Sequence, residues 1–409
     1  PFMSKRFSYN LFVGRKHLLV SYRKAKFSEI APKTNHPTRN LFSFPGHGAG
    51  DAIKKEGGRP HNPCEFQGMT RGLIVPLTPT YYIYVGGHMT LLKVSLDDKF
   101  TKEDGRIYLN GTQALVRLTL MQRRRDLAAG LNTAGYVTGY RGSPLGGMDK
   151  EFGAAARHLN AHHVKFHPGV NEDLAATAIW GSQQANLDQD LAKYVGVYGM
   201  WYGKGPGVDR SGDVFRHANM AGTSPNGGVL VLAGDDPSCK SSTVPSQSEH
   251  ALIDAQIPLL HPANTQEVLD YGILGWAMSR YSGCWVGMKC ITDNVDSSAS
   301  VAANPHRIEI VTPTDFEMPA DGLHIRWPDQ PMDAEMRLHK YKINAALAFA
   351  RAHDINKITM DSAKPRFGII STGKSYLDTL QALDDLGIDA AEADRLGLRL
   401  LKVGMPWPL

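Results

Sequence analysis

Residues 227–236, GGVLVLAGDD, hold an apolar run of strand length between a pair of glycines and a pair of aspartates. Comparable apolar runs occur elsewhere in the chain, and helical patterns separate nearly all of them. Strands that alternate with helices in this way are typical of a parallel sheet with helices packed on it. The sequence therefore predicts an α/β fold with a doubly wound, mostly parallel sheet, whose other strands we expect at 135–140, 164–167, 194–200 and 284–291.

Two long helical patterns flank these strands, over residues 111–132 and 266–282. In the first, Arg123, Arg124 and Arg125 follow one another, and we expect them to form a solvated turn. The second begins and ends at ordinary cap residues.

A second α/β unit follows the first. Residues 302–338 are rich in proline and lack a period, which indicates a linker or a surface-wrapping arm. A helix at 340–353, a strand at 366–371 and a helix at 375–386 come next. Because one strand-helix-strand unit cannot bury both faces of a sheet, we expect this second domain to begin here and to be truncated.

The amino-terminal stretch differs from the rest in charge and pattern. Residues 1–88 carry 13 Lys and Arg against 4 Asp and Glu, whereas residues 89–409 carry 32 against 36. We expect a poorly ordered basic leader over 1–88, which can also be interpreted as translated upstream sequence with Met89 as the natural start. The mildly acidic remainder argues against nucleic-acid binding. The expected domains are then 89–325, a linker at 326–339, and 340–409.

Cysteine content and hydropathy limit the class of protein. Cys64, Cys239, Cys284 and Cys290 form no C-x-x-C pair and are too few for a disulfide framework. We expect buried thiols in a reducing cytoplasm, with neither a metal ion nor an iron-sulfur cluster ligated by this chain alone. No run of 18 apolar residues occurs, so the sequence predicts no transmembrane helix and no membrane partner.

Three segments have the composition of ligand sites: GYRGSPLGG at 139–147, HPGVNEDLAATAIW at 167–180 and GKGPGVDRSGD at 203–213. Glycine turns bring backbone amides close to a ligand, and Glu172 opens a helix. Each segment also has a purely structural interpretation, because tight turns join strands to helices and acidic residues complement a helix dipole. The residues alone leave both interpretations open.

Two further segments imitate ligand sites. Residues 368–375, GIISTGKS, satisfy the phosphate-loop pattern, but Ile369 and Ile370 have the character of strand interior, where that pattern requires a phosphate cradle. Lys374 is then structural or a weak anion contact, and ATP binding is the alternative. Asp235 and Asp236 suggest a metal site, but adjacent carboxylates point apart, and turn chemistry explains these two residues as well.

Taken in order, the segments from residue 89 onward resemble one family, the thiamine-diphosphate-dependent 2-oxoacid:ferredoxin oxidoreductases, and most closely its indolepyruvate form. The resemblance implies a pyrimidine-binding domain of the thiamine-diphosphate fold at 89–325 and the start of a transketolase-C-terminal-like domain at 340–409. Family members continue with the domain that holds the cofactor's diphosphate and Mg²⁺. The likeness is carried by 139–147, 167–184, 203–219, 227–243, 247–260, 366–389 and 396–409.

The resemblance also implies a cofactor site. Glu172 matches the glutamate that this fold directs at the aminopyrimidine nitrogen of the cofactor, where a carboxylic acid shares its proton with the ring. The strand-end motif that lines the cofactor corresponds to Tyr140, Gly142, Ser143 and Pro144.

Candidate substrate-binding residues follow from the same match. Ser143 stands where the family has a hydroxyl residue that contacts the 2-oxoacid. Arg141 and Arg210 are candidates for pairing with the carboxylate of the substrate. The motif departs from the family at Arg141 and Gly142, so the role of Arg141 stays open.

The implied reaction is oxidative decarboxylation of an aryl pyruvate to an aryl-acetyl thioester of coenzyme A, with ferredoxin as electron acceptor and a homodimer as the assembly. Because one side of the cofactor site lies in a domain outside this sequence, we expect the chain to be inactive alone. The rival interpretations are a phosphate-loop ATP-binding protein and a non-catalytic fragment that keeps the fold.

Overall fold

The chain forms two compact units, Pro1–Leu96 and Asp97–Leu409. The structure is a computed structural model and describes residues 7–14, 17–24, 94–188, 190, 192–237 and 245–409. In the first unit the strands β1 (Phe7–Gly14) and β2 (His17–Lys24) pair antiparallel, a hairpin that the sequence pattern does not predict. The other residues of the expected basic leader lie outside the described residues, and so do Cys64 and Cys239.

The second unit is built on a six-stranded sheet that is parallel throughout, as predicted. The order of strands reverses in the middle of the sheet, because the chain first adds strands on one side of β4 and then on the other. This is the doubly wound arrangement. In spatial order the strands are β5 (Val164–Phe166), β4 (Ala134–Gly139), β6 (Val197–Lys204), β7 (Val229–Gly234), β9 (Val286–Cys290) and β8 (Leu259–Leu260).

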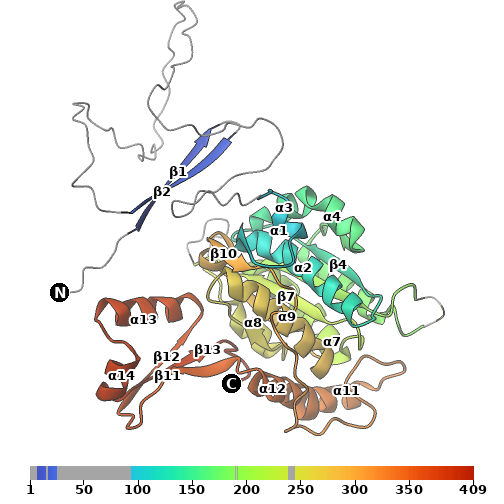
Figure 1. The fold of residues 1–409 in the computed structure, drawn as a ribbon. Coiled ribbons are helices and arrows are strands. Elements are labelled where there is room, and N and C mark those ends of the chain that lie inside the picture. Colours follow the sequence, from blue (N-terminus) through green and yellow to red (C-terminus); the bar gives the residue numbers. More distant parts are fainter. Residues whose placement is uncertain (1–6, 15–16, 25–93, 189, 191, 238–244) are drawn as a thin grey trace, which may run out of the picture. The chain divides into compact units, whose positions relative to one another are not determined.

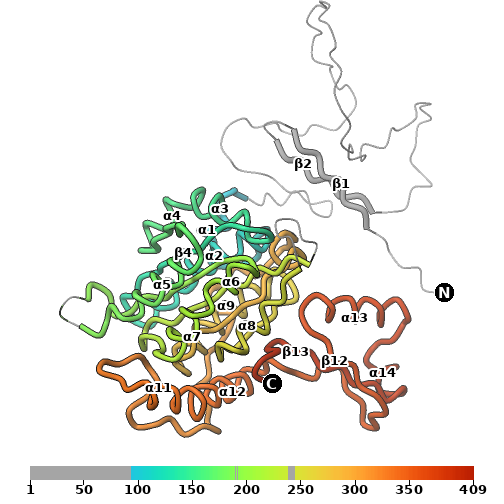
Figure 2. Tube along the Cα trace, turned by 180° about the vertical axis from the view of Figure 1, so that it is seen from behind, coloured from blue at the N-terminus to red at the C-terminus, as the bar shows by residue number. Residues whose placement is uncertain are grey.

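Helices pack on both faces of this sheet (Figures 1 and 2). The helices of the second unit are α1 (Asp98–Thr101), α2 (Gly111–Ala128), α3 (Met148–Ala154), α4 (Ala156–Ala161), α5 (Glu172–Gln184), α6 (Gly205–Arg210), α7 (Gly212–Ala221), α8 (Ser248–Asp254), α9 (Thr265–Ser282), α10 (Thr292–Val295), α11 (Pro331–Arg337), α12 (Ile343–Ala352), α13 (Gly373–Asp385) and α14 (Ala390–Leu396). A 3-10 turn covers Leu145–Gly147 and a π-helical turn covers Leu338–Lys342.

The sheet separates two hydrophobic cores. Along β7, Leu230 and Leu232 pack with α2 and α9, whereas Val229, Val231 and Ala233 pack with α5, α7 and α8. Successive side chains of a strand point to opposite faces, so a strand covered on both sides must be apolar at every position. This explains the unbroken run VLVLA, all of which is buried.

Helix α2 corrects one prediction. It starts with a capping box between Asn110 and Gln113 and ends before Gly130, whose φ is +76°. The expected solvated turn at residues 123–125 is wrong: Arg123 is 3% exposed and donates to the backbone oxygen of Thr133. Arg124 donates to Phe100 O at 2.7 Å. These guanidinium groups donate to carbonyls of neighbouring segments, which offsets part of the cost of burying them.

A small antiparallel pair lies beside the main sheet and was not predicted. It joins β3 (Arg106–Asn110) to β10 (Ser298–Ala302). The β10 sequence SASVA lacks an apolar run, so its strand conformation comes from pairing with a segment far away in the chain. Residues 303–330 carry no helix or strand, as the proline-rich pattern indicates, whereas α11 lies inside the stretch expected to lack structure.

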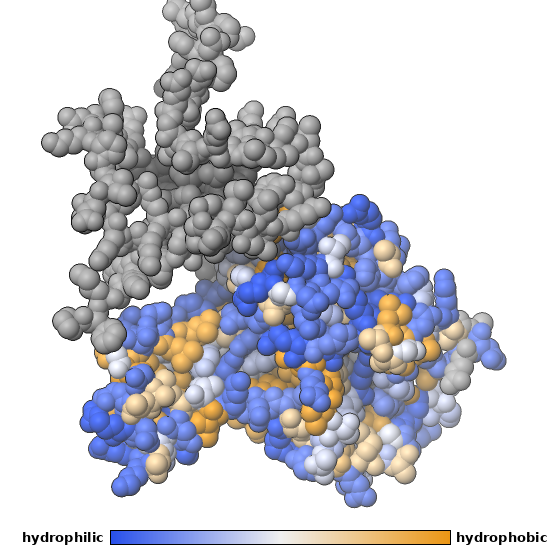
Figure 3. Space-filling view, viewed as in Figure 1, coloured by the Kyte–Doolittle hydropathy of each residue, from blue (hydrophilic) through white to orange (hydrophobic). Residues whose placement is uncertain are grey.

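The carboxyl-terminal part forms a three-stranded sheet in the order β11 (Asn356–Met360), β13 (Leu398–Val403), β12 (Phe367–Thr372). The predicted strand and helix correspond to β12 and α13, while β11, β13 and α14 were not predicted. Hydrophobic side chains gather over the carboxyl-terminal part in Figure 3. Phe367 and Ile370 of β12 are exposed. Lys402 of β13 pairs with Glu267 of α9, which ties this sheet to the larger one.

No helix within the described residues is long and apolar enough to cross a membrane.

Candidate functional site

The predicted site segments meet at the carboxyl edge of the large sheet. Strand β4 ends at Gly139, beside Tyr202 of β6, and β6 ends at Lys204, beside Gly234 of β7. Because these strands are parallel neighbours, the loops that follow them lie next to one another. The fold therefore brings together motifs that are up to about a hundred residues apart in the sequence.

The first loop carries Tyr140 to Pro144. The backbone N–H of Tyr140 donates to Tyr202 O at 2.9 Å, which continues the β4–β6 pairing for one more residue. The Ser143–Pro144 peptide is cis, and Pro144 is buried. Tyr140 and Arg141 are exposed.

Gly142 is required by a close approach. A β-carbon at this position would lie 2.7 Å from Cδ of Lys204, at the end of the neighbouring strand. The lysine stem therefore runs over the glycine, and a larger residue would require this stem to move.

Glu172 is the first residue of α5, after the cap residue Asn171, whose side chain accepts from Leu174 N at 2.9 Å. The loop before the helix is held to β4, because Gly169 N donates to Gly139 O at 2.8 Å. The backbone oxygen of Glu172 accepts from the indole N–H of Trp201 at 2.9 Å. These contacts fix the start of α5 at the edge of the sheet.

The carboxyl group of Glu172 is held in an unusual environment. Its residue is 7% exposed, and a β-carbon on Gly207 would lie 2.5 Å from its Cγ and 2.8 Å from its Oε1. None of the described residues donates a hydrogen bond to this carboxyl group. The carboxyl group can therefore accept a hydrogen bond from a donor that comes from outside the described residues.

Arg210, a candidate partner of the substrate, is the last residue of α6 and lies near Glu172 in the fold. Its Nε donates to Asp173 Oδ1 at 2.8 Å, and its side chain is about half exposed. The arginine is therefore at the predicted edge, but in this structure it is engaged with a carboxylate of the protein. Substrate binding by Arg210 stays a prediction.

A buried ionic cluster at the same edge was missed by the sequence analysis. Asp235, directly after β7, is 1% exposed and accepts from the hydroxyl of Ser248 at 2.6 Å and from Lys289 Nζ at 3.3 Å. Burial raises the pKa of the Asp235 carboxyl, against the opposing effects of Ser248 and Lys289. Lys289 also pairs with Glu249. The sequence feature that could have revealed this cluster was a lysine inside the apolar run of β9.

The phosphate-loop look-alike does not form a phosphate loop. Strand β12 continues to Thr372 and α13 starts at Gly373, so Ile369 and Ile370 are strand residues, as predicted. Lys374 forms an ion pair with Asp378 at 2.5 Å one turn further along α13.

Two cavities of the described residues lie elsewhere. One of about 570 Å³ is lined by the ends of α2 and α9, by residues 306–312 and by α12. Another of about 490 Å³ lies beside β4, β5 and the start of β6. Neither is lined by a residue of the predicted cofactor or substrate sites.

Comparison with known proteins agrees with the motifs. The family model of the indolepyruvate oxidoreductase domain matches residues 357–409. The indolepyruvate oxidoreductase subunit IorA of Methanothermobacter marburgensis is 24% identical over 322 residues, which is 77% of this chain and 45% of that protein. IorA of Pyrococcus abyssi is 24% identical over 326 residues, 78% of this chain and 44% of that one. The chain thus spans less than half the length of these relatives.

Solved structures include similar folds. The 2-oxoglutarate:ferredoxin oxidoreductase of Magnetococcus marinus, with 2-oxoglutarate, coenzyme A and succinyl-CoA bound, matches with a TM-score of 0.54 and 15% identity. The match covers 75% of this chain and 55% of that one. The resemblance and the α/β fold class inferred from the sequence are confirmed.

Proposed function

We propose that this chain, a relative of the indolepyruvate oxidoreductases, supplies the aminopyrimidine-binding half of a thiamine-diphosphate site in a 2-oxoacid oxidoreductase. The observation that carries the proposal is the carboxyl group of Glu172. Its residue is 7% exposed at the carboxyl edge of a doubly wound sheet, and the carboxyl group receives no hydrogen bond from the described residues. A ring nitrogen that shares a proton with this group would give it a hydrogen-bond partner.

The residues around Glu172 fit such a cofactor. Gly207 leaves the carboxyl group room on one side, and Gly142 lets the loop of residues 140–144 pass close to β6. The loop then offers the hydroxyl of Ser143 and the exposed ring of Tyr140 on the same edge. When bound, thiamine diphosphate supplies the nucleophilic carbon and the electron sink of the reaction.

Within this scheme the chain itself does three things. The carboxyl group of Glu172 would hold a proton beside the aminopyrimidine of a bound cofactor. Ser143 donates to an oxygen of the 2-oxoacid. Arg141, and Arg210 when it releases Asp173, neutralise the carboxylate of the substrate.

The substrate class and the partners follow from the relatives. Two relatives are named indolepyruvate oxidoreductase subunits, which favours an aryl 2-oxoacid over a short one. The solved neighbour was determined with coenzyme A and its thioester, which favours an acyl-CoA product, and its name supports ferredoxin as the acceptor. We propose that the assembly is a homodimer located in the cytoplasm, and that Mg²⁺ and any iron-sulfur cluster are ligated outside this chain.

The test is ferredoxin or viologen reduction by the whole enzyme with an aryl pyruvate and coenzyme A. Glu172→Gln keeps the shape of the side chain but cannot share a proton, so the rate should fall by about a hundredfold or more. Glu335→Gln, an exposed glutamate on α11, is the matched control and should keep the rate. A near-normal rate for Glu172→Gln would refute the assignment.

The isolated chain provides a second test. It should not reduce viologen, because the few hydrogen bonds to the aminopyrimidine are each worth about 1 kcal/mol and would leave the cofactor weakly held. Turnover by the chain alone would show that it contains a complete site. A whole enzyme that is inactive with every 2-oxoacid would favour the non-catalytic alternative.

A further inference from the structure

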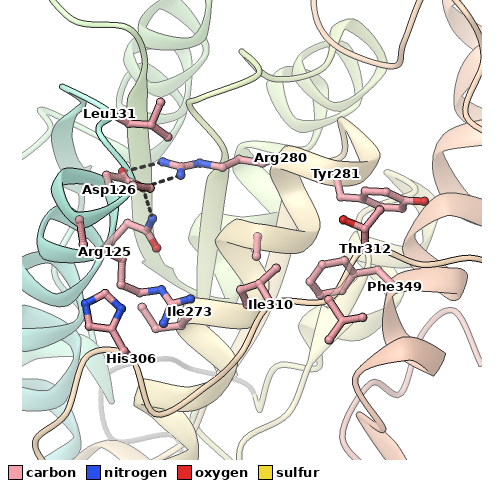
Figure 4. A pocket seen from close by; sticks show the side chains of 15 residues that line it. Arg125, Asp126, Leu131, Ile273, Arg280, Tyr281, His306, Ile310, Thr312 and Phe349 are labelled. Atoms are coloured by element: carbon pink, nitrogen blue, oxygen red, sulfur yellow. Dashed lines mark hydrogen bonds and ion pairs between the residues drawn. The ribbon is translucent and has the colours of Figure 1, made fainter.

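The cavity between α2, α9 and α12 has two chemically different ends. Figure 4 shows Arg125 and His306 at one end and Tyr281, Thr312 and Phe349 at the other, with Ile273 and Ile310 between them. The volume of about 570 Å³ lies within the range of small-molecule sites. The cavity therefore has the shape and polarity of a site for an amphipathic small molecule.

The cavity lies at the amino edge of the sheet, opposite to the proposed cofactor site. Helix α2 ends at Ala128, just before β4 begins, and α9 ends at Ser282, just before β9 begins. Since both helices run antiparallel to the strands, their carboxyl ends reach the edge where the strands start. A ligand here would not contact Glu172 or the loop of residues 140–144.

Two of the charged side chains that line the cavity, Asp126 and Arg280, form an ion pair with each other. Asp126 accepts from both Nη atoms of Arg280, at 2.7 and 2.8 Å, as the dashed lines in Figure 4 show. It also accepts from Gln122 at 2.8 Å and from Thr133 at 2.7 Å. The remaining Nε of Arg280 donates to Gly227 O at 2.9 Å. This pair is neutral, and each nitrogen of the Arg280 guanidinium already donates to an acceptor of the protein.

Arg125 is different. Its Nη1 donates to Pro305 O at 2.8 Å and to Ile308 O at 2.9 Å, which holds the strap of residues 303–312. Within the described residues, its Nε and Nη2 donate to no acceptor, and no carboxylate pairs with the guanidinium. These two N–H groups lie on one edge of the guanidinium and form the fork that binds a carboxylate through two hydrogen bonds.

The opposite end of the cavity accommodates an apolar group. The rings of Tyr281 and Phe349 have centroids 6.0 Å apart, and Ile273 and Ala277 of α9 line the floor. Ile310 and Val311 of the strap lie at the rim with large exposed areas for apolar residues. Covering this surface with a ligand would remove apolar area from water.

We propose that this cavity binds a monocarboxylate with an apolar body, whose carboxylate pairs with Nε and Nη2 of Arg125 and whose body packs toward Tyr281 and Phe349. Half-buried cations are costly without an anionic partner, and a ligand carboxylate supplies one. This site is separate from the proposed cofactor site, and its occupancy does not depend on the proposed function.

Isothermal titration of the 409-residue chain with 4-phenylbutyrate and octanoate tests the proposal. The two probes share the carboxylate and distinguish an aromatic from an aliphatic body. At least one should bind with a dissociation constant of about 1 mM or tighter, and its neutral amide should bind at least about tenfold more weakly. Equal affinity of an acid and its amide would overturn the proposal. So would the absence of binding by either acid at about 10 mM, which is roughly ten times the expected dissociation constant.

Variants locate the site. Arg125→Gln should weaken acid binding by about tenfold or more, and Arg125→Lys, which keeps the charge but loses the fork, by a smaller factor. Arg157→Gln, an exposed arginine on α4, is the matched control and should bind like the unmodified chain. Unchanged affinity in Arg125→Gln would overturn the proposal.

If Arg125→Gln lowers the melting temperature by releasing the strap, a second variant that fills the cavity still tests the proposal. Ile310→Trp leaves the guanidinium fork intact and fills the cavity from the rim. It should abolish binding of both acids without a loss of thermal stability. Retained binding in Ile310→Trp would place the acids elsewhere on the chain and overturn the assignment.

Discussion

The carboxyl group of Glu172 rests against the backbone of Gly207, and a β-carbon at 207 would come within 2.8 Å of Oε1. Glu172 is the first residue of α5, whereas Gly207 lies in the first turn of α6, and the two helices follow the ends of different strands. The carboxyl group of Glu172, which we propose holds the proton, occupies this position because Gly207 has no side chain. A methyl group at position 207 would displace it.

Gly207→Ala should therefore reduce the activity of the whole enzyme by about tenfold or more, because displacement of an acid-base group from its working position costs such factors. The fold should be kept, since alanine favours a helix over glycine. Steady-state viologen reduction and thermal unfolding measure the two effects. Gly181→Ala on α5, where a β-carbon would have nothing within 4 Å, is the control and should keep the rate. Equal rates in Gly207→Ala and Gly181→Ala would contradict the proposed role of Gly207.

Asp126→Asn should destabilise the chain by about 3–5 kcal/mol, because it leaves the largely buried Arg280 without its carboxylate. The oxygen and nitrogen atoms of asparagine cannot replace two charge-assisted bonds. Urea unfolding followed by tryptophan fluorescence gives the free energy. The exposed pair of Arg351 and Asp315 is the comparison, and Asp315→Asn should cost less than about 1 kcal/mol. A loss of similar size in both variants would contradict the argument from burial.

Lys342 should make stability depend on pH. Its ammonium group is fully buried and donates to Met220 O at 3.0 Å, and burial lowers its pKa from 10.5 to about 8. Between pH 8 and pH 10.5 the unfolded chain binds more protons at this group than the folded chain, so its contribution to stability rises with pH. Below pH 8 both states are protonated and the contribution is constant.

The measurement is the free energy of unfolding of the chain and of Lys342→Met at several pH values. The difference between them should shift in favour of the unmodified chain by up to about 1.4 kcal/mol per pH unit above pH 8. Parallel curves for the two proteins across pH 8–10 would show that Lys342 stays protonated in the fold.

Lys374 should be dispensable for nucleotide binding. The strand occupies the positions where a phosphate loop would curve, and the lysine pairs with Asp378 on an exposed face of α13. Titration with Mg-ATP should therefore give no micromolar binding, and Lys374→Ala should leave the melting temperature unchanged. Micromolar binding that disappears in Lys374→Ala would restore the ATP-binding alternative.

Much of the fold could be predicted from local patterns. The run VLVLA required a strand covered on both faces, and the position of Glu172 directly after Asn171 required the start of a helix. The glycine-rich turns predicted where β4 and β6 end. The alternation of strands with helices predicted the parallel sheet. These features depend on a few consecutive residues, so they can be read from the chain in order.

Other features depend on distant parts of the chain, and the tertiary structure alone decided them. Arg123 was expected in solvent but is buried, because carbonyl groups ten residues away lie beside it. The strand β10 exists because β3 pairs with it, and the environment of Glu172 is completed by Gly207. The side chain of Arg125 lines a cavity bounded by four separate segments. Local sequence periodicity records which side of an element is covered, whereas partners, close approaches and cavities arise only when separate elements pack together.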